Sequence, residues 1–256
     1  CALPILWLET KTVVVDGKAQ QVLYPKVYLA KQPAKSVDAM GGIISGKAIV
    51  SNTNADILNQ GIMTADTIVL GANDVENTGR IDGRKVTIKA SQDVINTGNI
   101  HGEKQVNINV GRDINVGAHV NRLQHHDIVG RQGTIGVGEK GDLVLSAKRD
   151  VNLKGAIVYT GDNSKATIEA GQNINLTTEA LSAKKDMTVN SENYNRTDRR
   201  TELGTAILSD SNVNLHAGND VNIRNGIVNS EHGVTSVEAG NDVTITNGQS
   251  YSRDEY

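Results

Sequence analysis

Acidic residues and asparagines recur along this 256-residue chain, mostly at intervals close to 20 residues or twice that. Such oxygen ligands could bind calcium in a column, and a carboxylate pair could cleave a polysaccharide by acid–base chemistry. The chain lacks the Gly-Gly-x-Gly-x-Asp pattern of calcium-binding β-rolls, and only 3% of its residues are aromatic, the kind that usually lines sugar subsites. We therefore interpret the series as corner residues whose side chains bond to local backbone N–H groups. It comprises Asp93, Asp113, Asp150, Asn173, Asp186, Asp220 and Asp242.

Two other features have residue types suited to metal binding or nucleophilic catalysis. His125 and His126 stand beside Asp127, but neighbouring side chains on a strand point to opposite faces, so we expect a solvated loop there. Cys1 is terminal, and the Gly-x-Ser-x-Gly motif of serine hydrolases is absent. The sequence therefore predicts no enzyme, no cofactor and no metal.

A basic cluster lies in the irregular segment 191–204 and is the strongest candidate for an interaction loop. Its candidate residues are Tyr194, Arg196, Arg199 and Arg200. They could contact an acidic partner or a lipid phosphate, although Asp198 and Glu202 dilute the positive charge. Loops on a rigid scaffold often carry function, so this loop is a possible contact surface.

The composition argues against a globular core and against a nucleic-acid partner. Phe is absent, Gly numbers 26 and Pro only 3, which suits thin repeated layers of small aliphatic residues. A net charge of −3 creates no global field that would favour nucleic acid. The chain starts at Cys1 without an initiator methionine, and we expect it to be a piece of a longer protein.

A short motif of the form Asp-apolar-x-Asn-x-Gly occurs three times, and its copies begin at Asp56, Asp74 and Asp93. Repeats of this length predict a stack of similar coils. Matching asparagines can then hydrogen-bond along the stack as an amide ladder, and matching glycines let the chain turn at one corner. These residues are Asn59, Asn77 and Asn96, and Gly61, Gly79 and Gly98.

Short segments with alternating apolar residues surround these motifs and predict strands with one inward face. They lie at 86–90, 106–110, 143–147, 166–170 and 213–217, with a weaker copy at 235–239. A strand pair this short is not stable alone, but stacked copies bury their aliphatic faces together. The sequence thus predicts an all-β fold, a right-handed parallel β-helix over residues 41–250. Ile88, Ile108 and Leu145 are expected to share its core.

The two ends of the chain and two internal segments depart from this repeat pattern. Residues 1–40 predict a β-hairpin around Asp16-Gly17, and we expect it to cap or flank the stack. Segments 118–133 and 191–204 predict loop insertions, and the exit segment 251–256 is expected to leave the stack. One interval, the 13 residues from Asn173 to Asp186, has no explanation in the repeat.

The repeats resemble the filamentous haemagglutinin family of bacterial exoproteins. The motifs that carry the resemblance are Asn-Thr-Gly-Arg-Ile at 77–81 with its two copies, and Ala-Gly-Asn-Asp-Val-Asn-Ile at 217–223 with a copy at 239–245. The lead-in at 22–29 and the exit at 251–256 are similar to the later haemagglutinin-repeat region of contact-dependent growth inhibition toxins.

This resemblance implies a secreted or cell-surface protein, exported by an outer-membrane two-partner-secretion transporter, that forms β-helical fibres and touches a target-cell surface or outer membrane. It offers no catalytic residues. We expect a non-catalytic rod segment of an adhesin or toxin-delivery exoprotein, and no nucleic-acid partner. A carbohydrate-active β-helix, which binds or cleaves polysaccharide, is the alternative, and direct membrane association is a third possibility.

Overall fold

The computed structural model describes residues 5–15, 18–28, 42–190 and 193–255. Within these ranges all regular elements are β-strands, so no apolar helix of membrane-spanning length occurs there. The chain divides into two units, residues 1–40 and 41–256. In the first unit, β1 (Ile5–Val15) pairs antiparallel with β2 (Lys18–Tyr28), which confirms the predicted hairpin. The Asp16-Gly17 turn lies outside the described residues, and the capping role of the hairpin stays a prediction.

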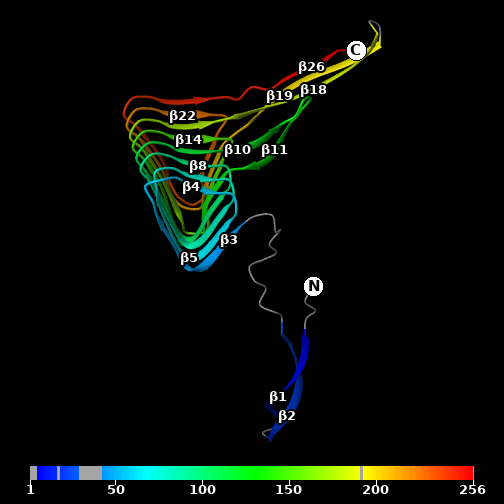
Figure 1. Ribbon diagram of the computed structural model, residues 1–256, viewed down its shortest axis with the longest axis vertical. Helices are drawn as coiled ribbons and strands as arrows, with labels where there is room; N and C mark the ends of the chain where they lie inside the picture. Colours follow the sequence, from blue (N-terminus) through cyan, green and yellow to red (C-terminus); the bar gives the residue numbers. More distant parts are fainter. Residues whose placement is uncertain (1–4, 16–17, 29–41, 191–192, 256) are drawn as a thin grey trace. The chain divides into compact units, whose positions relative to one another are not determined.

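The second unit is a stack of parallel coils, which confirms the predicted β-helix (Figure 1). One face of the stack is a parallel sheet built from the first strand of each coil. Its strands are, in order, β4 (Ile57–Asn59), β6 (Val75–Asn77), β8 (Val94–Asn96), β10 (Ile114–Arg122), β14 (Val151–Lys154), β17 (Ile174–Thr177), β22 (Val221–Arg224) and β25 (Val243–Thr246).

The other two faces come from a second sheet, whose early strands are long and bend at an elbow. These strands are β3 (Ile43–Asn52), β5 (Ile62–Ala72), β7 (Arg80–Ala90) and β9 (Asn99–Val110). Beyond β9 each long strand is replaced by two short ones. The first half of β9 accordingly pairs with one short strand, and its second half pairs with another. The pairs are β12 (Thr134–Val137) with β13 (Asp142–Ala147), β15 (Ile157–Thr160) with β16 (Lys165–Ala170), β20 (Ala206–Ser209) with β21 (Val213–Ala217), and β23 (Ile227–Ser230) with β24 (Thr235–Ala239).

A single aliphatic core runs through the stack. Ile108 is in register with Ile88 on one side and Leu145 on the other, and all three side chains are 0% exposed. The same column continues through Ile168 and Leu215. Each such side chain contributes about 1.5–3 kcal/mol by burial, so repetition rather than any one coil stabilises the fold.

The three asparagines of the motif form the predicted amide ladder in the interior. Asn59 Nδ2 donates to Asn77 Oδ1, and Asn77 Nδ2 donates to Asn96 Oδ1, both at 2.7 Å. The ladder ends at Asn96, whose Nδ2 donates to the carbonyl oxygen of Thr134 at 3.0 Å. In the next coil Val116 occupies the matching position, so an aliphatic column replaces the amides.

Replacing Asn77 with alanine is expected to cost about 1–3 kcal/mol, because Asn59 and Asn96 each lose a buried hydrogen-bond partner. Denaturant unfolding of the two proteins measures the difference. Asn152→Ala is the matched control, since Asn152 belongs to a half-buried amide ladder on the outer face, with bonds of 2.9–3.0 Å to Asn115 and Asn175. It is expected to cost less than about 1 kcal/mol. Equal losses in the two variants would contradict the special role of the buried ladder.

The aspartate series forms a second ladder at one corner, but the hydrogen-bond donors come from the next coil. Each side-chain oxygen accepts the backbone N–H of the matching residue one coil on, at N···O distances of 2.8–3.3 Å. The ladder runs through Asp56, Asp74, Asp93, Asp113, Asp150, Asn173, Asp220 and Asp242. Arg112 pairs with Asp93, and Arg149 pairs with Asp113, which offsets the repulsion between stacked carboxylates.

Asp186 is not a member of this ladder, so its assignment to the corner series was wrong. It lies in β18 (Glu179–Asn190), where Thr188 Oγ1 donates to its carboxylate at 2.6 Å and Arg196 Nε at 3.3 Å. The 13-residue step that breaks the rhythm is explained, because the coil continues directly from Asn173 to Asp220 around an inserted hairpin.

Acid is expected to weaken the corner through Asp93. The hydrogen bond from Arg112, helped by the Asp113 backbone N–H, lowers the pKa of Asp93 below its ordinary value of 3.8 even though burial opposes this. A carboxyl whose pKa is lower in the folded state stabilises above its unfolded pKa, and this stability is lost as the pH falls through the folded pKa. Asp93→Asn should therefore lower the melting temperature at pH 7, and the deficit should shrink between about pH 4 and pH 2.

Thermal melts at both ends of that range test this, with Asp142→Asn as the control. Asp142 is exposed on the outer surface, 3.7 Å from Lys165 Nζ. Its variant should change the melting temperature little, because exposed ion pairs contribute little to stability. A deficit of Asp93→Asn that stays constant from pH 7 to pH 2 would contradict the prediction.

The three motif glycines stack at another corner, but for a different reason from the one expected. None of the three has a positive φ; among the described glycines only Gly155 does. A Cβ on Gly79 would instead lie 2.1 Å from the carbonyl oxygen of Gly61, and one on Gly98 would lie 2.2 Å from that of Gly79. Close approach between successive coils therefore requires glycine here.

Both predicted loop insertions are β-hairpins, which corrects the expectation of irregular loops. In the first, β10 extends beyond the stack and pairs antiparallel with β11 (Asp127–Gln132). In the second, β18 pairs with β19 (Asn193–Leu203), and β26 (Tyr251–Glu255) adds a third strand. The hairpins project from one side of the stack (Figure 1). Sequence patterning missed them because both faces of these strands are largely polar.

Candidate interaction sites

The predicted interaction residues lie on β19, the central strand of the sheet β18-β19-β26, rather than in a loop. Alternation places Tyr194, Arg196 and Arg200 on one face of the strand and Arg199 on the other. The guanidinium carbon of Arg196 lies 5.2 Å from the centroid of the Tyr194 ring, which is a cation–π contact. The structure therefore brings three of the four residues to one face and separates the fourth.

Acidic neighbours neutralise part of this basic cluster. Arg196 pairs with Asp186, and Arg200 Nη2 lies 3.7 Å from Asp198 Oδ2. The other oxygen of Asp198 is the single buried side-chain polar atom among the described residues that has no hydrogen-bond partner. It lies beside a hollow that Lys184 and Arg253 also line. This face, which we call the hairpin face, presents paired charges.

The two hairpins are joined by an ion-pair cluster around Arg122. Arg122 pairs with Asp127 at 2.7 Å and with Glu179, and it donates to the Ala180 carbonyl oxygen at 2.8 Å. Asp127 also accepts the Ser182 backbone N–H at 2.8 Å, and this bond is the main reason that the pKa of Asp127 is lowered. These contacts tie the two projections into one unit.

The adjacent histidines take no part in a metal cluster among the described residues. His125 and His126 are exposed, as expected for a solvated segment. The carbonyl oxygen of His125 accepts the Lys184 backbone N–H at 2.6 Å, and His126 bridges to Ala183. Their structural part is thus to hold the first hairpin against the second.

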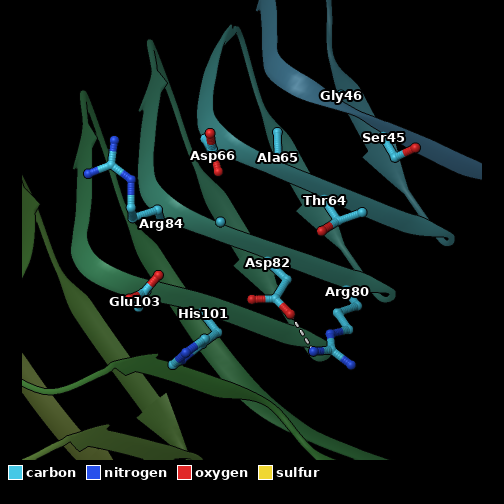
Figure 2. Close-up of a pocket in the computed structure, with 11 residues that line it drawn as sticks. Ser45, Gly46, Thr64, Ala65, Asp66, Arg80, Asp82, Arg84, His101 and Glu103 are labelled. Carbon is cyan, nitrogen blue, oxygen red and sulfur yellow. Dashed lines mark hydrogen bonds and ion pairs between the residues drawn. The ribbon is translucent and has the colours of Figure 1, made fainter. Parts of the chain in front are cut away.

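A polar groove follows the elbow of the long strands and was not predicted from the sequence. Figure 2 shows its residues, which come in rows, one residue from each strand β3, β5, β7 and β9. One row is Ser45, Thr64, Asp82 and His101, and the row at the elbow includes Asp66, Arg84 and Glu103. We call this the elbow groove.

The ring of His101, which lines the groove, lies beside the ring of Tyr159. Tyr159 Oη is 3.2 Å from His101 Nδ1, and the ring planes differ by 14° with centroids 6.1 Å apart. The Tyr159 ring lies across Gly136, where an added Cβ would meet it at 2.1 Å. Burial, with a contribution from nearby Asp82, raises the pKa of Tyr159, so it keeps its hydroxyl proton at neutral pH. The result is a flat aromatic platform.

The chemistry of the elbow groove suits a neutral, hydroxyl-rich ligand. Arg80 pairs with Asp82. Asp66, Arg84 and Glu103 add hydrogen-bond donors and acceptors, with charges of both signs. A flat apolar platform beside such polar groups is the arrangement that holds a sugar ring between stacking and hydrogen bonds. His101 and Tyr159 are 58 residues apart, and their meeting depends on coil stacking across Gly136, so the sequence carried no signal for it.

No family model, curated protein or solved structure matches this chain.

Proposed function

We propose that this chain is a non-catalytic rod segment of a secreted bacterial adhesin or contact-dependent toxin-delivery exoprotein. The observation that carries the proposal is the repetition of one core column and one aspartate ladder through successive coils. Because each coil contacts only its neighbours, such a scaffold gains length by adding coils, which is what a reach-giving rod requires. The haemagglutinin-type motifs at 77–81 and 217–223 agree with this reading.

The last coil of the stack supports a rod that continues. Val243 and Ile245 are in register with the buried Val221 and Ile223, yet they are 49% and 74% exposed. Such apolar side chains gain stability only when another layer covers them. In the proposed protein a further coil would do so. Export through an outer-membrane two-partner-secretion transporter and a secreted or cell-surface location follow from the family resemblance.

The hairpin face is the proposed contact with a target-cell surface or outer membrane. It projects from the stack and carries the exposed side chains of Arg196 and Arg200. Cosedimentation of the purified chain with intact cells, outer-membrane vesicles and protein-free liposomes tests the contact. A variant with Arg196 and Arg200 changed to serine should lose at least about tenfold in binding, the effect of about 1.4 kcal/mol.

The matched control changes the exposed Lys85 and Lys89 on the stack to serine, which removes the same charge elsewhere. It should bind as the unchanged chain does. Equal losses of binding in both variants would mean that net charge, and not the hairpin face, causes the binding. The absence of binding to any of the three surfaces would refute the proposed contact. Binding to liposomes alone would favour direct membrane association.

A carbohydrate-active β-helix is the second candidate function, and the aromatic platform of the elbow groove favours it. Glycan-array binding followed by calorimetry tests it. Tyr159→Ala should abolish binding, while Tyr251→Ala, on β26 outside the groove, should not. A cleavage assay on the bound glycans separates binding from catalysis. Turnover that is lost in Asp82→Asn would overturn the non-catalytic proposal.

A further inference from the structure

A cluster of three potential metal ligands lies at a corner between two successive coils. Asp210 follows β20 in one coil, and Glu231 and His232 follow β23 in the next. One ligand atom from each residue lies within 4.8 Å of the other two. The residues are 22 positions apart or fewer, which is one coil, so stacking alone brings them together.

The backbone at this corner is fixed by hydrogen bonds between the coils. Glu231 N–H donates to the Ser209 carbonyl oxygen at 2.9 Å, and His232 N–H donates to the Asp210 carbonyl oxygen at 2.7 Å. The Cα positions of the candidate ligands are therefore set before any ion arrives. Preorganisation of this kind lowers the entropy cost of ion binding.

The Asp210 carboxylate is oriented by a group outside the cluster. Its Oδ2 accepts the Asn163 backbone N–H at 2.6 Å, a bond that comes from the preceding coil. Its Oδ1 faces His232 Nδ1 at 2.7 Å. Hydrogen bonds that hold a ligand in this way are typical of the outer shell of metal sites. The carboxylate is 17% exposed and is the anchored member of the set.

We propose that Asp210, Glu231 and His232 form a divalent transition-metal site, best matched by Zn²⁺, that clips two coils together. One imidazole nitrogen with two carboxylate oxygens suits zinc, and a water can complete a four-coordinate shell. Calcium and magnesium are matched less well, because they favour oxygen ligands throughout. His232 is 70% exposed, so its ring can turn to present a nitrogen to the ion.

The position of the site gives it a structural consequence. It joins the coils of β20 and β23, close to the exposed last layer of the core at Val243 and Ile245. The preceding coil offers Asp162 and Asn163 at this corner and lacks an imidazole there. Zinc would therefore stiffen one particular pair of coils. By binding the folded stack and not the unfolded chain, it raises stability by mass action.

Calorimetry of the metal-free full chain with zinc, and cobalt absorption spectroscopy as a geometric probe, test this proposal. We expect one zinc per chain and a higher melting temperature in its presence. His232→Ala and Glu231→Gln should each weaken zinc binding at least about tenfold and remove the thermal gain. Both side chains are exposed, so neither change should disturb folding.

His216→Ala is the matched control. His216 is also an exposed histidine beside a carboxylate, with Nδ1 3.2 Å from Glu238 Oε2, but that pair has no third ligand among the residues that the structure describes. Its variant should bind zinc as the unchanged chain does. Zinc binding that is equal in His232→Ala and the unchanged chain, or the lack of saturable binding by the unchanged chain, would overturn the proposal.

Discussion

Replacing Leu145 with aspartate is expected to destabilise the stack by at least about 5 kcal/mol, a large part of the free energy of unfolding of an ordinary domain. Leu145 is 0% exposed and lies between Ile108 and Ile168 in the core column. The change removes the packing of the leucine and buries a carboxylate for which the column offers no partner. The backbone amides of the coils on both sides should lose their protection from hydrogen exchange together.

Hydrogen exchange followed residue by residue, together with denaturant unfolding, measures this effect. Val144→Asp is the control, because Val144 points outward between Asn107 and Thr167 and is only half-buried. It should cost less than about 1 kcal/mol, as surface changes usually do. If the two variants were equally stable, the single aliphatic core would be refuted.

Replacing Gly79 with alanine is expected to cost about 4 kcal/mol, even though it adds only one methyl group. The new Cβ would lie 2.1 Å from the carbonyl oxygen of Gly61 and within 2.8 Å of two further backbone atoms of residues 60 and 61. Backbone atoms at a coil corner cannot rotate away as a side chain can. The coils must therefore separate locally, which also stretches the amide ladder through Asn77.

Gly117→Ala supplies the comparison, since a Cβ on Gly117 would meet only the Lys154 carbonyl oxygen, at an ordinary 3.5 Å. That variant should unfold within about 0.5 kcal/mol of the unchanged protein. Calorimetric melts of both variants decide the matter. A small loss for Gly79→Ala would mean that the corner has more room than the close approach of its backbone indicates.

The repeating part of this protein was determined by its sequence. Alternation with a period of two fixed which side chains face inward, and the recurrence of the Asp-apolar-x-Asn-x-Gly motif fixed which residues lie over one another. Both signals are local and are copied in every coil, so they add up over the chain. The ladder of Asn59, Asn77 and Asn96 and the core column through Ile88 follow directly from them.

Only the tertiary structure decided the contacts between residues of different type that lie in different coils or insertions. Insertions of unequal length shift the numbering between coils, so nothing in the spacing pairs His101 with Tyr159. The polar strands of the projecting hairpins bury little, and their pairing is set by backbone hydrogen bonds, which every sequence can make. The corner glycines were found from the sequence, but the reason for them, the approach of one backbone to the next, exists only once the coils are stacked.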